Sequence, residues 1–264
     1  MISSVSNAQI KNIIKLQAKA KERNEQGVFI CEGRKMFEEA RQAKNVTVQK
    51  TYVSESFYEE MTAKASDYFD GVEYEIVSDA VFKQIAETMT PQGVLAVVTK
   101  PQHSLEEMIK GDVGTYVVLE DVRDPGNLGT IVRTAEGAGV KGVILSKGCV
   151  DIFNPKVIRS TMGAIYRMPF VYAEDFLGTL EKMKQSGISV YAAHLEGAVY
   201  YDEVSYEKKT AIMIGNEGNG LTREAADAAT SYIKIPMEGN VESLNAGIAA
   251  AVLMYEVYRQ NRNR

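Results

Sequence analysis

The sequence LEDVRDPGNLGTIVRTAEGAG, residues 119–139, joins a strand pattern to a helix pattern through a short polar loop. The apolar run 115–121 is typical of a buried strand, and apolar residues recur at helical spacing over 127–138, up to Gly139. In α/β proteins, ligands bind to loops that follow the carboxyl ends of parallel strands. This stretch therefore predicts an α/β fold with a ligand site at the loop.

The same alternation of strand and helix patterns continues to the end of the chain. Strands that alternate with helices predict a mostly parallel sheet with helices on both faces. The expected strands are residues 142–146, 168–173, 189–195, 210–215 and 231–237, and the expected helices are residues 155–166, 175–187, 222–229 and 244–260.

A smaller α/β pattern fills the first hundred residues. It begins with a helix pattern at 7–24 and continues with strand patterns at 27–33, 48–54, 74–78 and 93–100, separated by helical spacing. The stretch 101–112 starts with proline and has a glycine near its end, as connectors often do. We therefore divide the chain into one domain of residues 1–105 and a second of residues 113–264.

The composition is that of an ordinary globular protein. The chain has 264 residues, of which 45% are hydrophobic and 25% charged, and it holds two cysteines and two histidines. No apolar run is long enough to span a membrane, and the N-terminus lacks the apolar segment of a secretory signal. We expect a cytoplasmic protein with reduced thiols and no metal site.

The charge is spread unevenly. The formal net charge is −5, yet residues 1–45 hold nine basic and five acidic residues. A basic edge on an acidic protein is compatible with contact to an RNA backbone, and it equally fits a solvated helix face. If RNA binds there, the basic residues expected to contact it are Lys15, Lys19, Lys21, Arg23, Arg34 and Lys35.

Three loops of the second half carry polar residues suited to a ligand site. In the first, Arg133 follows Asn127 by six residues, and both are expected on one side of the helix start. In the second, residues 212–225, closely spaced glycines surround Glu217 and are expected to expose backbone N–H groups. In the third, residues 233–256, Ser243 is the expected N-cap of the last helix, and Asn245 lies in its first turn.

Each loop also fits a purely structural interpretation. Asn127 is a residue type found at helix N-caps, and Arg133 fits a solvated helix charge. The glycine loop is neither a phosphate-binding P-loop nor the dinucleotide pattern GxGxxG, so a simple glycine turn accounts for it as well. Taken alone, none of the three loops decides the function.

Together, in this order and spacing, the three segments resemble the SpoU (TrmH-like) branch of the SPOUT RNA methyltransferases. DPGNLGTIVRTA matches the first motif of the family, GNEGNGL the second, and IPMEGNVESLNAGIAAAVLMYE the third. The match covers residues 115–260. The segment beginning at NIIKLQAKAK resembles, more loosely, the L30e-like RNA-binding domain found in this family.

The resemblance implies a C-terminal SPOUT α/β domain with a deep trefoil knot, preceded by a small L30e-like α/β domain. It implies that S-adenosylmethionine binds in the knot and that the protein works as a homodimer. By position, the cofactor contacts fall at Leu195, Gly215, Ile235 and Leu244. One departure is noted: Ala246 and Gly247 stand where the family usually carries a Val-Ser-like pair, and we expect altered packing there.

The implied reaction is methyl transfer to a ribose 2′-hydroxyl, and the resemblance makes Arg133 its central residue. Because arginine side chains have pKa values above about 12, we expect Arg133 to act as a cation that anchors phosphate and stabilises the developing alkoxide. Asn127 would orient Arg133 or the ribose. The catalytic set would be completed by Glu217, Ser243 and Asn245, which hold that network in place.

The RNA target is less sharply defined than the reaction. The two-domain layout resembles the enzymes directed at rRNA, and we expect 23S rRNA, more than those directed at tRNA, which lack the first domain. Two alternatives stay open: a tRNA 2′-O-methyltransferase, and a catalytically silent RNA-binding or ribosome-assembly protein of the same fold. A nucleotide-dependent oxidoreductase is disfavoured because GxGxxG is missing.

Overall fold

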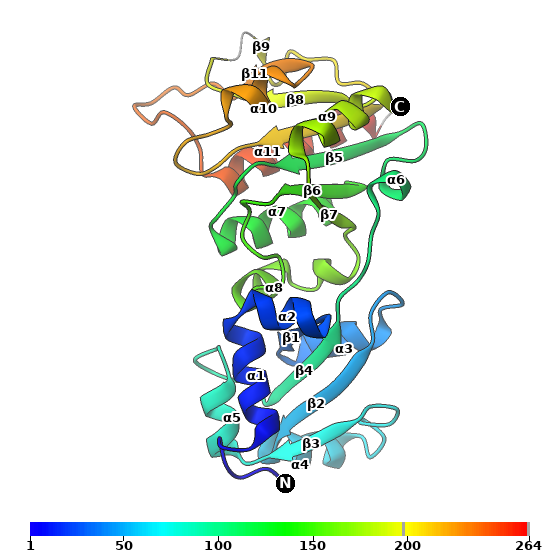
Figure 1. The fold of residues 1–264 in the computed structure, drawn as a ribbon, viewed down its shortest axis with the longest axis vertical. Helices are drawn as coiled ribbons and strands as arrows, with labels where there is room; N and C mark the ends of the chain where they lie inside the picture. Colours follow the sequence, from blue (N-terminus) through cyan, green and yellow to red (C-terminus); the bar gives the residue numbers. More distant parts are fainter. Residues whose placement is uncertain (197–198, 263–264) are drawn as a thin grey trace. The chain divides into compact units, whose positions relative to one another are not determined.

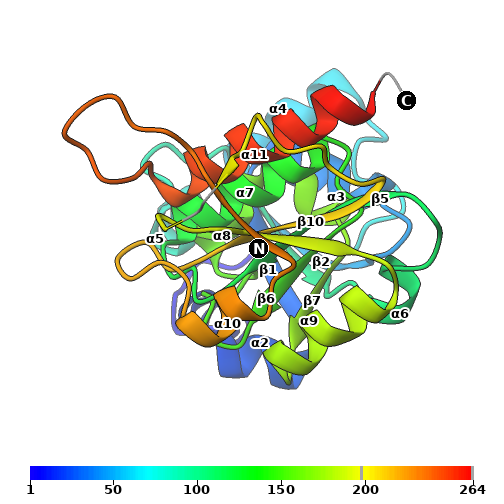
Figure 2. The same ribbon diagram turned by 90° about the horizontal axis from the view of Figure 1, so that it is seen from above.

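The computed structural model describes residues 1–196 and 199–262 and divides into two compact units (Figures 1 and 2). The first unit comprises Met1–Gln102 together with Asp151–Tyr166, and the second comprises His103–Val150 together with Arg167–Arg264. Within the described residues, no helix is long and apolar enough to cross a membrane.

The second unit is built on a seven-stranded sheet in which all neighbouring strands are parallel. The strand order is β7-β6-β5-β10-β8-β11-β9, which confirms the predicted α/β class. The strands are β5 (Gly114–Leu119), β6 (Gly142–Ser146), β7 (Phe170–Ala173), β8 (Ser189–Ala193), β9 (Val199–Tyr200), β10 (Lys209–Ile214) and β11 (Ser231–Lys234). The two-residue β9 was not predicted, since so short a strand has no periodic signal.

Helices cover both faces of this sheet (Figure 2). On one face, α7 (Pro125–Gly137) packs against α11 (Ala246–Asn261). The other face carries α9 (Phe176–Gln185) and α10 (Arg223–Asp227), which bury Leu180 and Ala225 against apolar strand residues such as Met213. A four-residue helix, α6 (Leu105–Met108), lies in the predicted connector.

The first unit has a mixed four-stranded sheet in the order β1-β4-β2-β3. Strand β4 is antiparallel to both of its neighbours, whereas β2 and β3 are parallel. The strands are β1 (Val28–Glu32), β2 (Val48–Ser54), β3 (Tyr74–Val77) and β4 (Val94–Thr99), and the helices are α1 (Ala8–Ala18), α2 (Ala20–Gln26), α3 (Arg34–Gln42), α4 (Glu55–Lys64) and α5 (Asp79–Ile85).

The predicted helix over 7–24 is in fact two helices, α1 and α2, separated at Lys19. Lys19 has extended backbone, with φ −127°. The break leaves carbonyl groups without helical partners, and the Arg23 guanidinium donates to two of them, Leu16 O at 2.6 Å and Gln17 O at 2.9 Å. Arg23 thus supplies hydrogen bonds to two carbonyl groups at the break between the helices.

The predicted helix over 155–166 is also shorter than expected. Helix α8 (Pro155–Thr161) ends at Met162, which adopts the left-handed conformation with φ 50°, and the 3-10 turn η1 (Ala164–Tyr166) follows. Helix α8 packs on β1 of the first unit, and the ring of Phe153 lies 5.0 Å from that of Phe29. Residues 151–166 thus complete the core of the first unit, although they lie inside the predicted domain 113–264.

Candidate active site

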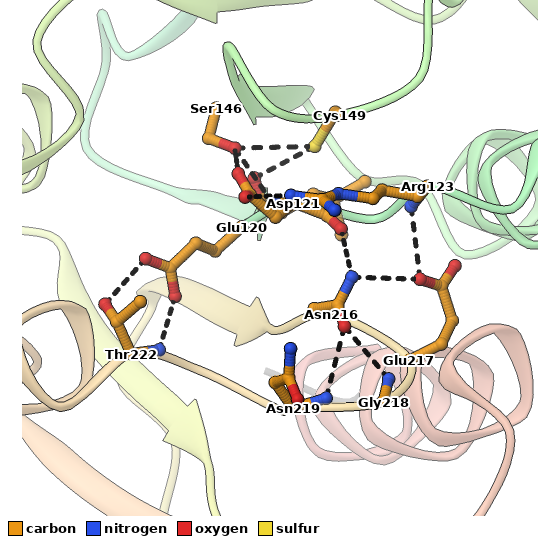
Figure 3. Close-up of polar contacts among 11 residues, drawn as sticks. Glu120, Asp121, Arg123, Ser146, Cys149, Asn216, Glu217, Gly218, Asn219 and Thr222 are labelled. Carbon is orange, nitrogen blue, oxygen red and sulfur yellow. Dashed lines mark hydrogen bonds and ion pairs between the residues drawn. The ribbon is translucent and has the colours of Figure 1, made fainter.

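The loop after β5 and the loop after β10 meet because their strands are neighbours in the parallel sheet. The carboxylate of Glu217 accepts a hydrogen bond from the backbone amide of Arg123 at 3.1 Å (Figure 3). It also accepts from the backbone amide of Asp124 (2.9 Å) and from Asn127 Nδ2 (3.1 Å). Burial opposes ionisation of Glu217, but the bonds from Asn127, Asp124 and Arg123 outweigh it and lower its pKa. Glu217 therefore clamps the first loop as an anion.

Asn127 connects this clamp to the last helix. Asn245 Nδ2 donates to Asn127 Oδ1 at 2.8 Å, while Asn127 donates to Glu217. Asn245 Oδ1 accepts from the amides of Gly247 (2.9 Å) and Ile248 (3.2 Å). The structure therefore joins three predicted site residues, one from each loop, into a continuous chain of hydrogen bonds.

The predicted helix caps need correction. Asn245, and not Ser243, is the N-cap of α11, because its side-chain oxygen accepts from two of the first free amides. Asp124 caps α7 by accepting from the Asn127 amide at 2.8 Å. The N-cap interpretation of Asn127 is therefore wrong, and its side chain is available to link Glu217 with Asn245.

The glycine loop is closed on itself. A Cβ at Gly215 would lie 2.2 Å from the backbone carbon of Gly220, so only glycine fits there. Asn216 Oδ1 accepts from the amides of Gly218 (3.0 Å) and Asn219 (3.1 Å), and Gly220 N donates to Asn216 O (2.9 Å). The expectation that this loop exposes its N–H groups is wrong for these three amides, since Asn216 consumes them.

Asn216 also ties the glycine loop to the end of β5. Its Nδ2 donates to Asp121 O at 2.8 Å. Asp121 has a positive φ of 54°, which a non-glycine residue rarely adopts, and its side chain accepts from Ser146 Oγ at 2.7 Å. A Cβ at Gly148 would lie 2.0 Å from Asp121 Oδ1. This strained turn is a feature that sequence reasoning missed.

A buried carboxylate anchors the far side of the same loop. Glu120 is 9% exposed and accepts from the amide of Thr222 (2.8 Å) and from its hydroxyl (2.7 Å), at the start of α10. The adjacent acids Glu120 and Asp121 at the end of an apolar strand were the available signal. Acids in that position are rarely buried unless they are hydrogen-bonded.

Two members of the predicted catalytic set stand apart from this network. Arg133 is exposed on α7, and its side chain forms no hydrogen bond or ion pair with any of the described residues. Six residues of α-helix turn the side-chain direction by about 600°, so Arg133 and Asn127 point about 120° apart. The prediction that both lie on one side of the helix start is therefore wrong. Ser243 is exposed in the loop before α11. The structure does not place Arg133 or Ser243 in contact with Asn127.

The four positions expected to hold the cofactor surround one edge of the sheet. Leu195, Gly215 and Ile235 follow the carboxyl ends of β8, β10 and β11, which are consecutive in the strand order β10-β8-β11. Leu244 lies just before α11. Leu195 is 66% exposed, and Ile235 and Leu244 are half-buried, so apolar side chains are available to cover a ligand. This donor-poor, partly apolar set fits an adenosyl group better than a phosphate.

The basic residues expected to contact RNA divide into two kinds. Five of them are exposed: Lys15 on α1, Lys19 between α1 and α2, Lys21 on α2, and Arg34 and Lys35 on α3. Arg23 is only 2% exposed, and its guanidinium binds Asp151 and two carbonyl oxygens. Arg23 is therefore not available to an RNA phosphate, and its expected RNA contact is wrong.

The fold is that of an α/β protein with a parallel sheet, a class in which ligands bind at the carboxyl ends of the strands. The family model of the SpoU rRNA Methylase family matches residues 114–255, and that of the MRM3-like substrate binding domain matches residues 7–96. The chain belongs to the SpoU rRNA methylase family. The predicted enzyme class of this family, an RNA 2′-O-ribose methyltransferase that uses S-adenosylmethionine, is confirmed.

Relatives match over nearly the whole length. The 23S rRNA (guanosine(2553)-2′-O)-methyltransferase RlmP of Bacillus subtilis is 32% identical over 97% of this chain and 98% of its own. An uncharacterized tRNA/rRNA methyltransferase of Synechocystis is 32% identical over 98% of this chain and 93% of its own. An AdoMet-bound rRNA methyltransferase from Sinorhizobium meliloti superposes with a TM-score of 0.86 at 32% identity, covering 98% and 97% of the two chains.

Proposed function

We propose that this enzyme methylates a ribose 2′-hydroxyl in rRNA, and specifically in 23S rRNA. The main support is the set of hydrogen bonds that links Glu217, Asn127 and Asn245 and so connects the three motif loops. In addition, RlmP matches this protein over 97% of its length. A solved structure that concerns 2-OH methylation of C/U34 on tRNA covers only 58% of this chain, although 100% of its own chain is matched. The extra N-terminal unit favours rRNA over tRNA.

In the proposed reaction, the enzyme aligns the 2′-oxygen with the methyl group for in-line displacement. Bound S-adenosylmethionine supplies an electrophilic methyl group on a sulfonium. Arg133, exposed and without a partner among the described residues, anchors the RNA phosphate as a cation and stabilises the negative charge that develops on the 2′-oxygen. Asn127, Glu217 and Asn245 hold the loops in position, and Ser243 completes the set from the loop before α11.

The cofactor is proposed to lie against Leu195, Gly215, Ile235 and Leu244. The closely packed glycine loop supports this, because a side chain at Gly215 would push the loop off Gly220. A deep trefoil knot in this part of the chain belongs to the same proposal, as does the L30e-like character of the first unit.

The enzyme is further proposed to act as a cytoplasmic homodimer. Helix α11, whose N-cap is Asn245, carries exposed apolar side chains at Ile248, Tyr255 and Tyr258. These positions recur at helical spacing and are the kind of surface that homodimers bury. Ile248→Asp should convert a dimeric species into a monomer in light scattering, whereas Leu177→Asp, at an exposed leucine on α9, should not. A monomeric wild-type protein would contradict the dimer.

The deciding experiment maps 2′-O-methyl groups in total RNA from a deletion strain and its parent. We expect one 23S rRNA position to lose its methyl group and to regain it with the wild-type gene but not with Arg133→Ala. Loss confined to a tRNA position would replace the proposal by the tRNA alternative. Identical maps would support the catalytically silent alternative.

A further inference from the structure

The segment 151–166 leaves the second unit after Val150 and returns to it at Arg167. It lies within the part of the sequence that matches the methylase family model, yet it packs in the core of the first unit. Phe153 is 6% exposed and contacts Phe29, while Lys100 Nζ lies 4.5 Å from the centre of its ring. Residues 151–166, which connect Val150 to Arg167 of the second unit, are therefore part of the first unit.

A buried ion pair fixes the start of this segment. Arg23 Nη2 lies 2.6 Å and Nε 2.9 Å from Asp151 Oδ2, and the side chain of Arg23 is 3% exposed. Asp151 Oδ1 accepts from the amide of Phe153 at 3.0 Å. Arg23 is itself held by the carbonyls at the end of α1. Because an uncompensated charge on the buried Arg23 would be costly, the guanidinium keeps the Asp151 carboxylate beside it.

The residues that flank the segment are bonded to the loop after β5 and to helix α7. Val150, next to Asp151, donates its amide to Val122 O at 2.9 Å, and Val122 precedes the Arg123 amide that binds Glu217. Arg167, next to Tyr166, forms an ion pair with Glu136 on α7, three residues beyond Arg133. A displacement of residues 151–166 would thus reach the loop at 122–124 and the helix that carries Arg133.

We propose that Arg23 and Asp151 are positioning residues for methyl transfer. Their ion pair fixes the segment 151–166, and this segment sets the loop at Val122–Asp124 and helix α7 while the first unit holds RNA. The role rests on the proposed function, since it needs an RNA substrate. Neither residue touches the reacting atoms, so neither is a catalytic residue.

The test uses full-length Asp151→Asn, Arg23→Met and the double variant in a methyl-transfer assay with 23S rRNA. A misplacement of about 1 Å costs up to about 100-fold in rate, so we expect each single variant to lose about 10- to 100-fold in kcat. The Kd for S-adenosylmethionine should stay within about twofold, because the cofactor loops are untouched. The double variant should be no slower than Arg23→Met, because both changes break one interaction.

Two controls separate positioning from loss of folding. Lys50→Met removes an ion pair of the same unit, with Glu73 at 2.9 Å, and should leave kcat unchanged. Asp151→Asn keeps the size and an acceptor for the Phe153 amide, so it tests the idea even if Arg23→Met does not fold. All rates are measured below the unfolding transition of each variant. Arg23→Lys, which keeps the charge but not the two-nitrogen contact, should recover part of the rate.

A folded Asp151→Asn with wild-type kcat would overturn the inference, as would an equal loss of cofactor affinity. These outcomes differ from failure of the proposed function. If wild-type enzyme itself methylated no rRNA, the reaction assignment would fall first.

Discussion

The loops around Glu217 differ from the surroundings of Arg133 and Ser243 in how their side chains are hydrogen-bonded. Glu217, Asn127 and Asn245 satisfy one another, and Asn216 consumes three amides of its own loop. Arg133 and Ser243, by contrast, point into solvent. The contrast teaches that the predicted site residues fall into a set that shapes the loops and a set that is exposed to solvent. Substitutions should separate the two by their effects.

The largest effect is expected at Arg133. Arg133→Ala removes the cation proposed to stabilise the developing charge and should lower kcat by about 100- to 1,000-fold. The Kd for S-adenosylmethionine, measured by calorimetry, should hardly change, because Arg133 supports no loop. Arg223→Ala is the matched control, since it removes an exposed arginine of the same unit. Full activity of Arg133→Ala would contradict the proposed role of Arg133 in the reaction.

The loop-shaping set is tested next at Gly215. A Cβ there would meet backbone at 2.2 Å, so Gly215→Ala must displace the glycine loop. Cofactor affinity should fall by about tenfold or more, an effect of about 1.4 kcal/mol or more. Gly239→Ala, where a Cβ would meet nothing within 4 Å, should bind normally. Unchanged affinity in Gly215→Ala would mean that the cofactor lies elsewhere.

A smaller effect is expected from the basic edge of the first unit. The double change Lys19→Glu and Lys21→Glu reverses two exposed charges and should weaken RNA binding by about tenfold at low salt. The slope of log Kd against log salt should also become shallower. Lys64→Glu, at an exposed lysine on α4 of the same unit, should change neither quantity. An unaltered slope would remove α1 and α2 from the RNA surface.

The smallest effect concerns the charge of Glu217. Its pKa is lowered in the folded protein, so its stabilising effect is present above its ordinary value of 4.5 and is lost as the pH falls through the lowered value. The Tm of Glu217→Gln should therefore lie slightly below that of the wild type at pH 7, and the gap should close in acid. The comparison should run from about pH 3 to about pH 7, which spans ordinary carboxyl pKa values. A difference in Tm that stays constant over this range would show that the charge of Glu217 does not contribute to stability.

Periodicity and motif order carry most of the fold and the reaction class. The buried strands β5, β6 and β10 stand out because a short apolar run bounded by turn residues is typical of a strand covered on both faces. The helix caps were misassigned because several cap-forming residues adjoin each helix start, and only the observed bonds distinguish Asp124 from Asn127. Arg23 was misplaced because sequence shows its charge but not the carbonyls at the break after α1.

The joining of residues 151–166 to the first unit was beyond sequence reasoning for a related reason. Domain boundaries are inferred from connectors, and the stretch 101–112 has the composition of one. The return of residues 151–166 to the core of the first unit has no comparable signal in the composition of the sequence. Only contacts such as Phe29 with Phe153 reveal it.

The shared segment also bears on how the protein is made. A ribosome delivers residues 1–102 well before Asp151–Tyr166. Until then, β1 lacks the cover of α8, and Arg23 lacks its carboxylate partner. The nascent first unit must wait for residues 103–166, of which 103–150 belong to the second unit, before its core can close. The first unit thus completes its core only after part of the second unit has been synthesised. A gene fragment that ends at the connector 101–112 encodes a first unit without residues 151–166.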